Sequence, residues 1–241
     1  MRIIFNAILM ALEVAAIVAV AWAGLHAPLL FAAGTAALAL GLGVSLEIAR
    51  LNNEMPFYFD CQPGKLRLFT ALVGSTEAFV KALLAGVVAL LTFLGTDTER
   101  LTSVAICFGI CLFLGVQIVR GLANAFQARP LRWGYFRLAA PLGLLFSGGL
   151  SMLPSPGITE MAKRAAFDMP ERPSLEQASE FLFLLKQSFD DIVERMLGLV
   201  FDPGVAQGLA ALVSVNMLSG FVLALYAVAI AETIRALESK V

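Results

Sequence analysis

Charged residues are scarce in this chain of 241 residues, because Asp, Glu, Lys and Arg make up 15% of it, against about 25% in a soluble domain. Apolar residues make up 59%, and the mean hydropathy is +0.85. A water-soluble protein of this size cannot bury that much apolar surface. The shortage of charge therefore excludes soluble enzymes and disordered chains, and it indicates a polytopic membrane protein.

Histidine, cysteine and excess basic charge are also scarce. One His and three Cys exclude a haem held by paired histidines, a His-rich metal site and a disulfide scaffold. The net charge of −1 offers no basic surface for DNA or RNA. The chain also has no phosphate-binding loop, no H-E-x-x-H and no G-x-S-x-G motif. We therefore expect a non-catalytic protein without a metal, a cofactor or a nucleic-acid partner.

Long apolar runs are what the chain has instead. Six segments reach the length needed to cross the hydrocarbon core, which is about 20 helical residues. Their apolar residues are continuous rather than alternating, which excludes barrel strands, so we predict an all-α bundle of six transmembrane helices. The first run is too long for a signal peptide and contains Glu13, which argues against cleavage. The segments are 3–25, 27–48, 66–94, 101–126, 131–153 and 205–231.

The charges between these segments predict the orientation. Lys and Arg concentrate in the second and fourth loops, whereas the loop 154–204 holds nine acidic and five basic residues. By the positive-inside rule we predict that both termini lie on the cytoplasmic side of the membrane. The Ala-rich segments and the regular alternation of loop charge favour a bacterial inner membrane. We predict a five-span bundle over 1–153, an extracytoplasmic helical loop over 154–204, and a sixth span with a short cytoplasmic tail over 205–241.

Small residues recur every fourth position on three of the segments, and such stripes let membrane helices approach closely. Because the first two segments are joined by a short loop, we predict that they form a tight antiparallel hairpin. The alternative is that one stripe faces a partner subunit. The stripes are Ala7, Ala11, Ala15, Ala19 and Ala23; Ala33, Ala37, Gly41 and Ser45; and Ala139, Gly143, Ser147 and Ser151. The fourth segment has a shorter set of the same spacing, Cys107, Cys111 and Gly115.

Polar side chains inside the apolar segments are the candidate functional residues, since a charge at mid-bilayer costs at least ~2.5–3.5 kcal/mol. Glu13 lies roughly 15 Å into the first segment at 1.5 Å per residue. Glu77 and Lys81 lie one turn apart on the third, and Asn216 lies near the middle of the sixth. We predict one intramembrane cluster of these four residues. It is either an ion or proton site or a neutralised knot that fixes helix register.

Other polar residues lie near the ends of segments. Glu47, Gln117 and Arg120 are examples, and we expect them to cap helices or to extend toward the membrane surface.

The acidic loop contains an amphipathic pattern over 174–200, in which apolar residues are spaced by three and four. We predict a helix whose apolar face docks onto another subunit, the alternative being that it lies on the membrane surface. The docking residues are Leu175, Leu182, Leu185, Phe189, Ile192 and Met196.

Several functions fit these features. The first is a non-catalytic membrane subunit of a multiprotein transport, secretion or ion-conducting assembly, with lipid and other membrane subunits as partners. The alternative is an autonomous proton- or cation-coupled carrier or channel built on Glu13, Glu77 and Lys81. A third, a lipid-modifying enzyme, would have to use Glu54 and Asp60, the clustered acids nearest the headgroups.

Overall fold

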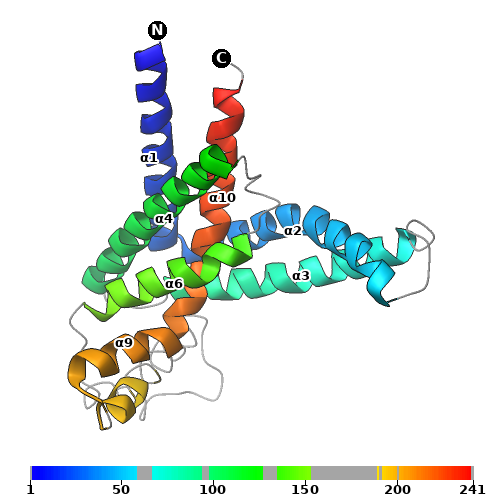
Figure 1. Ribbon diagram of the computed structural model, residues 1–241. Coiled ribbons are helices and arrows are strands. Elements are labelled where there is room, and N and C mark those ends of the chain that lie inside the picture. Colours follow the sequence, from blue (N-terminus) through cyan, green and yellow to red (C-terminus); the bar gives the residue numbers. More distant parts are fainter. Residues whose placement is uncertain are drawn as a thin grey trace.

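The computed structural model describes residues 2–58, 67–93, 98–126, 135–152, 189, 192–199 and 201–239. Within them the chain is helical and forms no strand, which confirms the all-α prediction. Both chain ends lie at the same end of the molecule, and α2 and α3 extend to one side (Figure 1). The helices are α1 (Arg2–His26), α2 (Pro28–Tyr58), α3 (Arg67–Thr92), α4 (Thr98–Phe126), α6 (Tyr135–Ser151), α9 (Pro203–Val213), η1 (Val215–Leu218) and α10 (Ser219–Glu238).

Five of the described stretches are helical, long and apolar enough to cross a membrane, as expected of a multi-pass membrane protein. The first four coincide with four of the six predicted segments. The predicted segment 131–153 is described only as α6, whose 17 residues fall short of the ~20 that a crossing needs, so this crossing stays a prediction. The five stretches are Ile4–His26, Pro28–Glu54, Leu68–Thr92, Arg100–Phe126 and Asn216–Glu238.

The prediction of one continuous span over 205–231 is wrong. Ser214, with φ −58° and ψ 141°, interrupts the helix between α9 and η1. Its side-chain oxygen accepts a hydrogen bond from the Asn216 backbone N–H at 3.0 Å, which satisfies a donor at the start of the new helix. The apolar stretch that can cross the membrane is therefore displaced toward the C-terminus, to Asn216–Glu238.

The predicted hairpin of the first two segments is also wrong. The Ala27 backbone N–H donates to the Ala23 carbonyl at 2.9 Å, and the Phe31 N–H donates to the Ala27 carbonyl at 2.9 Å. A single residue, Ala27, therefore joins the two helices, since it takes part in the last helical bond of α1 and in the first of α2. The chain turns there without reversing its direction (Figure 1). In Figure 1, α2 diverges from α1 and pairs along its length with α3. We call this α2–α3 pair the arm.

The two small-residue stripes that were to form that hairpin face outward. The stripe residues from Ala7 to Ala19 on α1 and from Ala33 to Ser45 on α2 are all exposed. The buried face of α1 instead carries Leu9, Glu13, Ile17 and Ala21. The position of the small residues did not identify the packed face of either helix, because exposing an alanine side chain to lipid costs little free energy.

The most buried of the five apolar stretches contains α10, which crosses α4 and α6 in a region that we call the hub. Of the apolar stretch that includes α10, 61% is buried, against 22% for the stretch that includes α1. Gly143 and Gly220 allow α6 and α10 to approach closely: a Cβ on Gly220 would overlap the Ala139 carbonyl oxygen and the Gly143 backbone. The stripe of the fifth segment therefore does serve helix packing.

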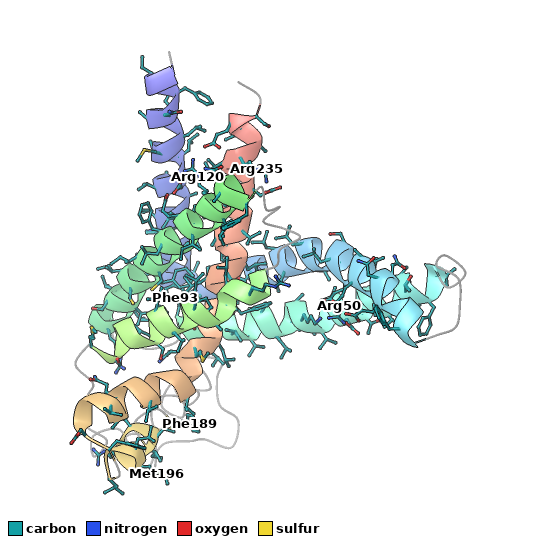
Figure 2. All side chains as sticks on the ribbon, viewed as in Figure 1. Arg50, Phe93, Arg120, Phe189, Met196 and Arg235 are labelled. Atoms are coloured by element: carbon teal, nitrogen blue, oxygen red, sulfur yellow. The ribbon has the colours of Figure 1, made fainter. Side chains whose placement is uncertain are left out.

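Aromatic side chains fill the junction between the hub and the arm. Phe93 meets Phe31 and Phe108 edge to face, with ring centroids 5.1 and 5.2 Å apart (Phe93 is labelled in Figure 2). The Thr35 hydroxyl donates to the Phe31 carbonyl at 2.7 Å. It has no second proton, so the Tyr226 hydroxyl, 3.0 Å away, donates to Thr35. This bond ties α10 to the base of the arm.

The predicted docking helix is described only at 189 and 192–199. Residues 192–198 are helical, and Phe189, Ile192 and Met196 are exposed. Phe189 and Met196 lie at the end of the molecule away from the termini (Figure 2). Leu175, Leu182 and Leu185 lie outside the described residues, so the helix and its partner stay a prediction.

Candidate functional site

The four polar residues predicted to form one cluster lie in three places. Glu13 contacts Gln117 and Arg120 on α4, Glu77 and Lys81 lie on the arm, and Asn216 lies in η1. Arg120, which binds Glu13, and Arg50, which binds Glu77, lie in separate parts of the molecule (Figure 2). Among the described residues there are therefore two separate ionic clusters, whereas the sequence predicted one polar cluster.

The first, the Glu13 cluster, consists of Glu13, Gln117, Arg120 and Glu238. Gln117 Nε2 donates to Glu13 Oε1, and Arg120 Nη1 donates to Glu13 Oε2, both at 2.5 Å. Arg120 Nη2 donates to Glu238 Oε1, also at 2.5 Å. Glu13 is 1% exposed, so its charge depends on these partners. One guanidinium thus ties α1, α4 and α10 together near the two chain ends.

A cavity of about 270 Å³ adjoins the Glu13 cluster, between α1 and α4. All four members of the cluster line it, together with the amide side chain of Asn6. The rest of the lining is apolar and consists of Leu9, Met10, Val14 and Phe113. A cavity with a few convergent polar groups among apolar ones is the usual form of a small-ligand site.

The charge in this cavity is negative. Two carboxylates, Glu13 and Glu238, face one guanidinium, that of Arg120. Arg235 lines a small adjoining hollow with Arg120 and Glu238, but it is not part of the cavity lining. The cavity therefore favours a proton or a cationic group over an anion.

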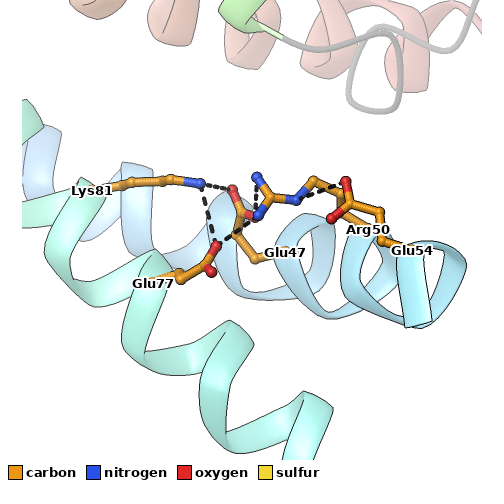
Figure 3. Close-up of polar contacts among 5 residues, drawn as sticks. All are labelled: Glu47, Arg50, Glu54, Glu77 and Lys81. Atoms are coloured by element: carbon orange, nitrogen blue, oxygen red, sulfur yellow. Dashed lines mark hydrogen bonds and ion pairs between the residues drawn. The ribbon is translucent and has the colours of Figure 1, made fainter. Parts of the chain in front are cut away.

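The second, the arm cluster, consists of Glu47, Arg50 and Glu54 on α2 and Glu77 and Lys81 on α3 (Figure 3). Arg50 lies 2.8 Å from Glu77, 3.1 Å from Glu47 and 3.4 Å from Glu54. Lys81 Nζ lies 2.5 Å from Glu47 Oε1 and 3.6 Å from Glu77 Oε2. The five side chains extend from one side of the helix pair and link α2 to α3 (Figure 3).

Burial is uneven within the arm cluster. Glu47 is 3% exposed, whereas the side chains of its partners Arg50 and Lys81 are 45% and 30% exposed. Two cations therefore stabilise one buried carboxylate, while their outer ends stay accessible. With three carboxylates and two cations, this cluster also carries one excess negative charge.

The sequence did not identify all members of the clusters. Glu47, Gln117 and Arg120 were expected to act as residues at helix ends, but Glu47 is buried and the other two bind the buried Glu13. Their spacing could have identified these residues as members of polar clusters. Gln117 and Arg120 lie one turn apart on α4, as do Glu47 and Arg50 on α2. Within the described residues no group of three metal-ligating side chains is present.

Comparison with family models, with curated proteins and with solved structures finds no match for this chain. Its function is therefore argued from its own geometry.

Proposed function

We propose that this protein is a non-catalytic integral membrane subunit of a multiprotein transport, secretion or ion-conducting assembly. The observation that carries the proposal is the arm cluster. It is a charged surface on a pair of helices that extends away from the other described helices (Figure 1).

Exposure of the arm cluster to lipid is energetically unfavourable. Both arm helices contain stretches apolar enough to cross a membrane, and the cluster lies within these stretches. Four of its five side chains are between 30% and 45% exposed. A charge at the bilayer centre costs ~2.5–3.5 kcal/mol. A polar surface of another subunit, or water enclosed between subunits, removes that cost.

The outward stripes of small residues on α1 and α2 support the same proposal. Stripes of this kind let a second helix approach within contact of the backbone. On this chain they remain uncovered by the described helices. The exposed Phe189, Ile192 and Met196 add an apolar surface at the opposite end.

Affinity purification from the native membrane in a mild detergent, followed by native mass spectrometry, tests the proposal. We expect other chains at fixed stoichiometry. The double variant Arg50→Gln with Glu77→Gln removes one charge of each sign, and it should lower the co-purified amount at least tenfold. Val87→Ala, on the exposed apolar side of α3, is the control and should leave it unchanged. A lone chain or a simple homo-oligomer contradicts the proposal.

The proposal includes six crossings of a bacterial inner membrane with both termini in the cytoplasm. The loop charges support this orientation, and so does the common position of the two chain ends (Figure 1). A fluorescent protein fused after residue 241 should fluoresce, and alkaline phosphatase inserted in the loop 154–204 should be active. The reverse pattern contradicts the orientation.

The second candidate function is an autonomous proton- or cation-coupled carrier or channel, and the cavity beside the buried Glu13 favours it. Because Glu77 and Lys81 lie on the arm, the transport site would consist of the Glu13 cluster alone. In proteoliposomes with a pH-sensitive dye, Glu13→Gln should abolish flux, whereas Glu54→Gln should retain it. Equal flux in both variants would rule this candidate out.

A further inference from the structure

The cavity beside the Glu13 cluster has two unlike sides. Its polar side is formed by Glu13, Gln117, Arg120, Glu238 and Asn6. Its apolar side is formed by side chains that are also exposed on the surface of the molecule: Met10 is 63%, Val14 48% and Phe113 38% exposed. These three residues lie within stretches that can cross a membrane, so the cavity adjoins the space that acyl chains occupy.

Several hydrogen-bond acceptors on the polar side of the cavity have no donor within the described residues. Both oxygens of Glu13 are engaged, by Gln117 and by Arg120. Glu238 uses only its Oε1, and within the described residues its Oε2 accepts no hydrogen bond. Gln117 donates through Nε2, and its Oε1 is likewise unengaged in the described part of the chain. The side-chain amide of Asn6 makes no hydrogen bond there either.

These acceptors match one chemical group. A primary ammonium has three N–H donors and one positive charge. Glu238 Oε2, Gln117 Oε1 and Asn6 Oδ1 supply three acceptors, and the cavity carries one excess negative charge. At about 270 Å³ the cavity is smaller than most drug-sized sites, which suits a headgroup rather than a whole lipid.

We propose that this cavity binds the primary ammonium headgroup of an aminophospholipid, taken from the leaflet on the side of the two chain ends. The acyl chains lie outside the cavity, along Met10, Val14 and Phe113. The proposal does not depend on whether the chain assembles with other subunits.

The test uses the full-length chain in nanodiscs with equal parts of phosphatidylethanolamine, phosphatidylcholine and phosphatidylglycerol. Native mass spectrometry of the released protein counts the lipids that stay bound. We expect phosphatidylethanolamine to be retained at least tenfold over the other two, because a trimethylammonium has no N–H donor and glycerol has no charge. Equal retention of all three overturns the proposal.

Two variants assign the binding to the cavity. Glu238→Gln removes the excess charge, and Met10→Trp narrows the apolar entrance without changing any charge. Each should lower the retained phosphatidylethanolamine at least fivefold. Glu54→Gln makes the same chemical change as Glu238→Gln, but on the arm, and should have no effect. If both cavity variants retain the lipid as the unmodified chain does, the site lies elsewhere.

A competition separates a lipid from a soluble amine. Millimolar ethanolamine should not displace phosphatidylethanolamine, because the acyl chains contribute to binding. Displacement by ethanolamine would assign the cavity to a water-soluble amine and overturn the lipid part of the proposal.

Discussion

The hub and the arm hold their helices together by different means. In the hub, α10 crosses α6 at a pair of glycines, and 61% of its apolar stretch is buried. In the arm, only 22% of the apolar stretch of α2 and 28% of that of α3 are buried. The hub therefore depends on close fit between helices distant in sequence. The arm depends on one neighbouring helix pair and a set of charges.

The two ionic clusters repeat this contrast. Each has one buried carboxylate, Glu13 or Glu47, and each has one more carboxylate than cations. In the part of the chain that the structure describes, Glu47 has two cationic partners, Arg50 and Lys81, whereas Glu13 has one, Arg120. We therefore expect the arm cluster to tolerate the loss of one cation and the Glu13 cluster not to. Two of the four substitutions below test this expectation, and the other two test the contrast between the hub and the arm.

Arg120→Met should have the largest effect. It leaves the buried Glu13 carboxylate with the Gln117 amide as its remaining partner, and breaking a buried ion pair costs about 3–5 kcal/mol. Unfolding in detergent, followed by circular dichroism, measures the loss. Adding Glu13→Gln removes the uncompensated charge and should restore much of the stability. If the double variant is no more stable than Arg120→Met, the pair is not the cause.

Gly220→Ala should follow, because its new methyl group would overlap the Ala139 carbonyl oxygen at the crossing of α6 and α10. Overpacking of this kind costs about 1–3 kcal/mol. The matched change on the arm is Gly86→Ala, whose Cβ would lie 3.2 Å from Ala36 Cβ and 3.3 Å from the Ala32 carbonyl oxygen. It should lower the melting temperature less than Gly220→Ala does. Equal losses would remove the distinction between hub and arm.

Tyr226→Phe tests the link between the two regions. It deletes the hydroxyl that donates to Thr35, while the Thr35 bond to the Phe31 carbonyl stays in place. The expected loss is about 0.5–1.5 kcal/mol, the usual net value of one hydrogen bond. Thr35→Val removes the other partner, and a double-mutant cycle should give a coupling of the same size. Additive effects would show that the bond contributes nothing.

Lys81→Met should have the smallest effect, since Arg50 remains beside Glu47 and Glu77. We expect a loss of about 0.2–1 kcal/mol, as for a partly exposed ion pair. The comparison with Arg120→Met in the same denaturation assay is the decisive one. A loss as large as that of Arg120→Met would mean that the arm cluster has no redundancy.

Local features of this fold could be predicted from the sequence. Continuous apolar runs identified the helices and four of the five crossing stretches, because length and hydropathy belong to a segment by itself. The place of Glu13 within a long apolar helix and the pairing of Glu77 with Lys81 followed from position and spacing alone.

Features that depend on contacts between segments could not be predicted. The exposed alanines of α1 have the same composition as a packing stripe, and only the positions of the other helices decide which face is buried. The break at Ser214 lies in an apolar run without a Pro or Gly beside it, so the local signal for a break was weak. Arg120 is 107 residues from Glu13, so no spacing rule joins them.

The joint between α1 and α2 has a mechanical consequence. A single residue, Ala27, joins α1 to the arm, and its N–H and its carbonyl take part in the last helical bond of α1 and the first of α2. The 26 residues of α3 make the arm about 39 Å long, and a rotation of about 5° at the joint would displace its far end by roughly 3 Å. Because the joint is a single residue, such a displacement changes the angle at Ala27, directly beside the helix that carries Glu13.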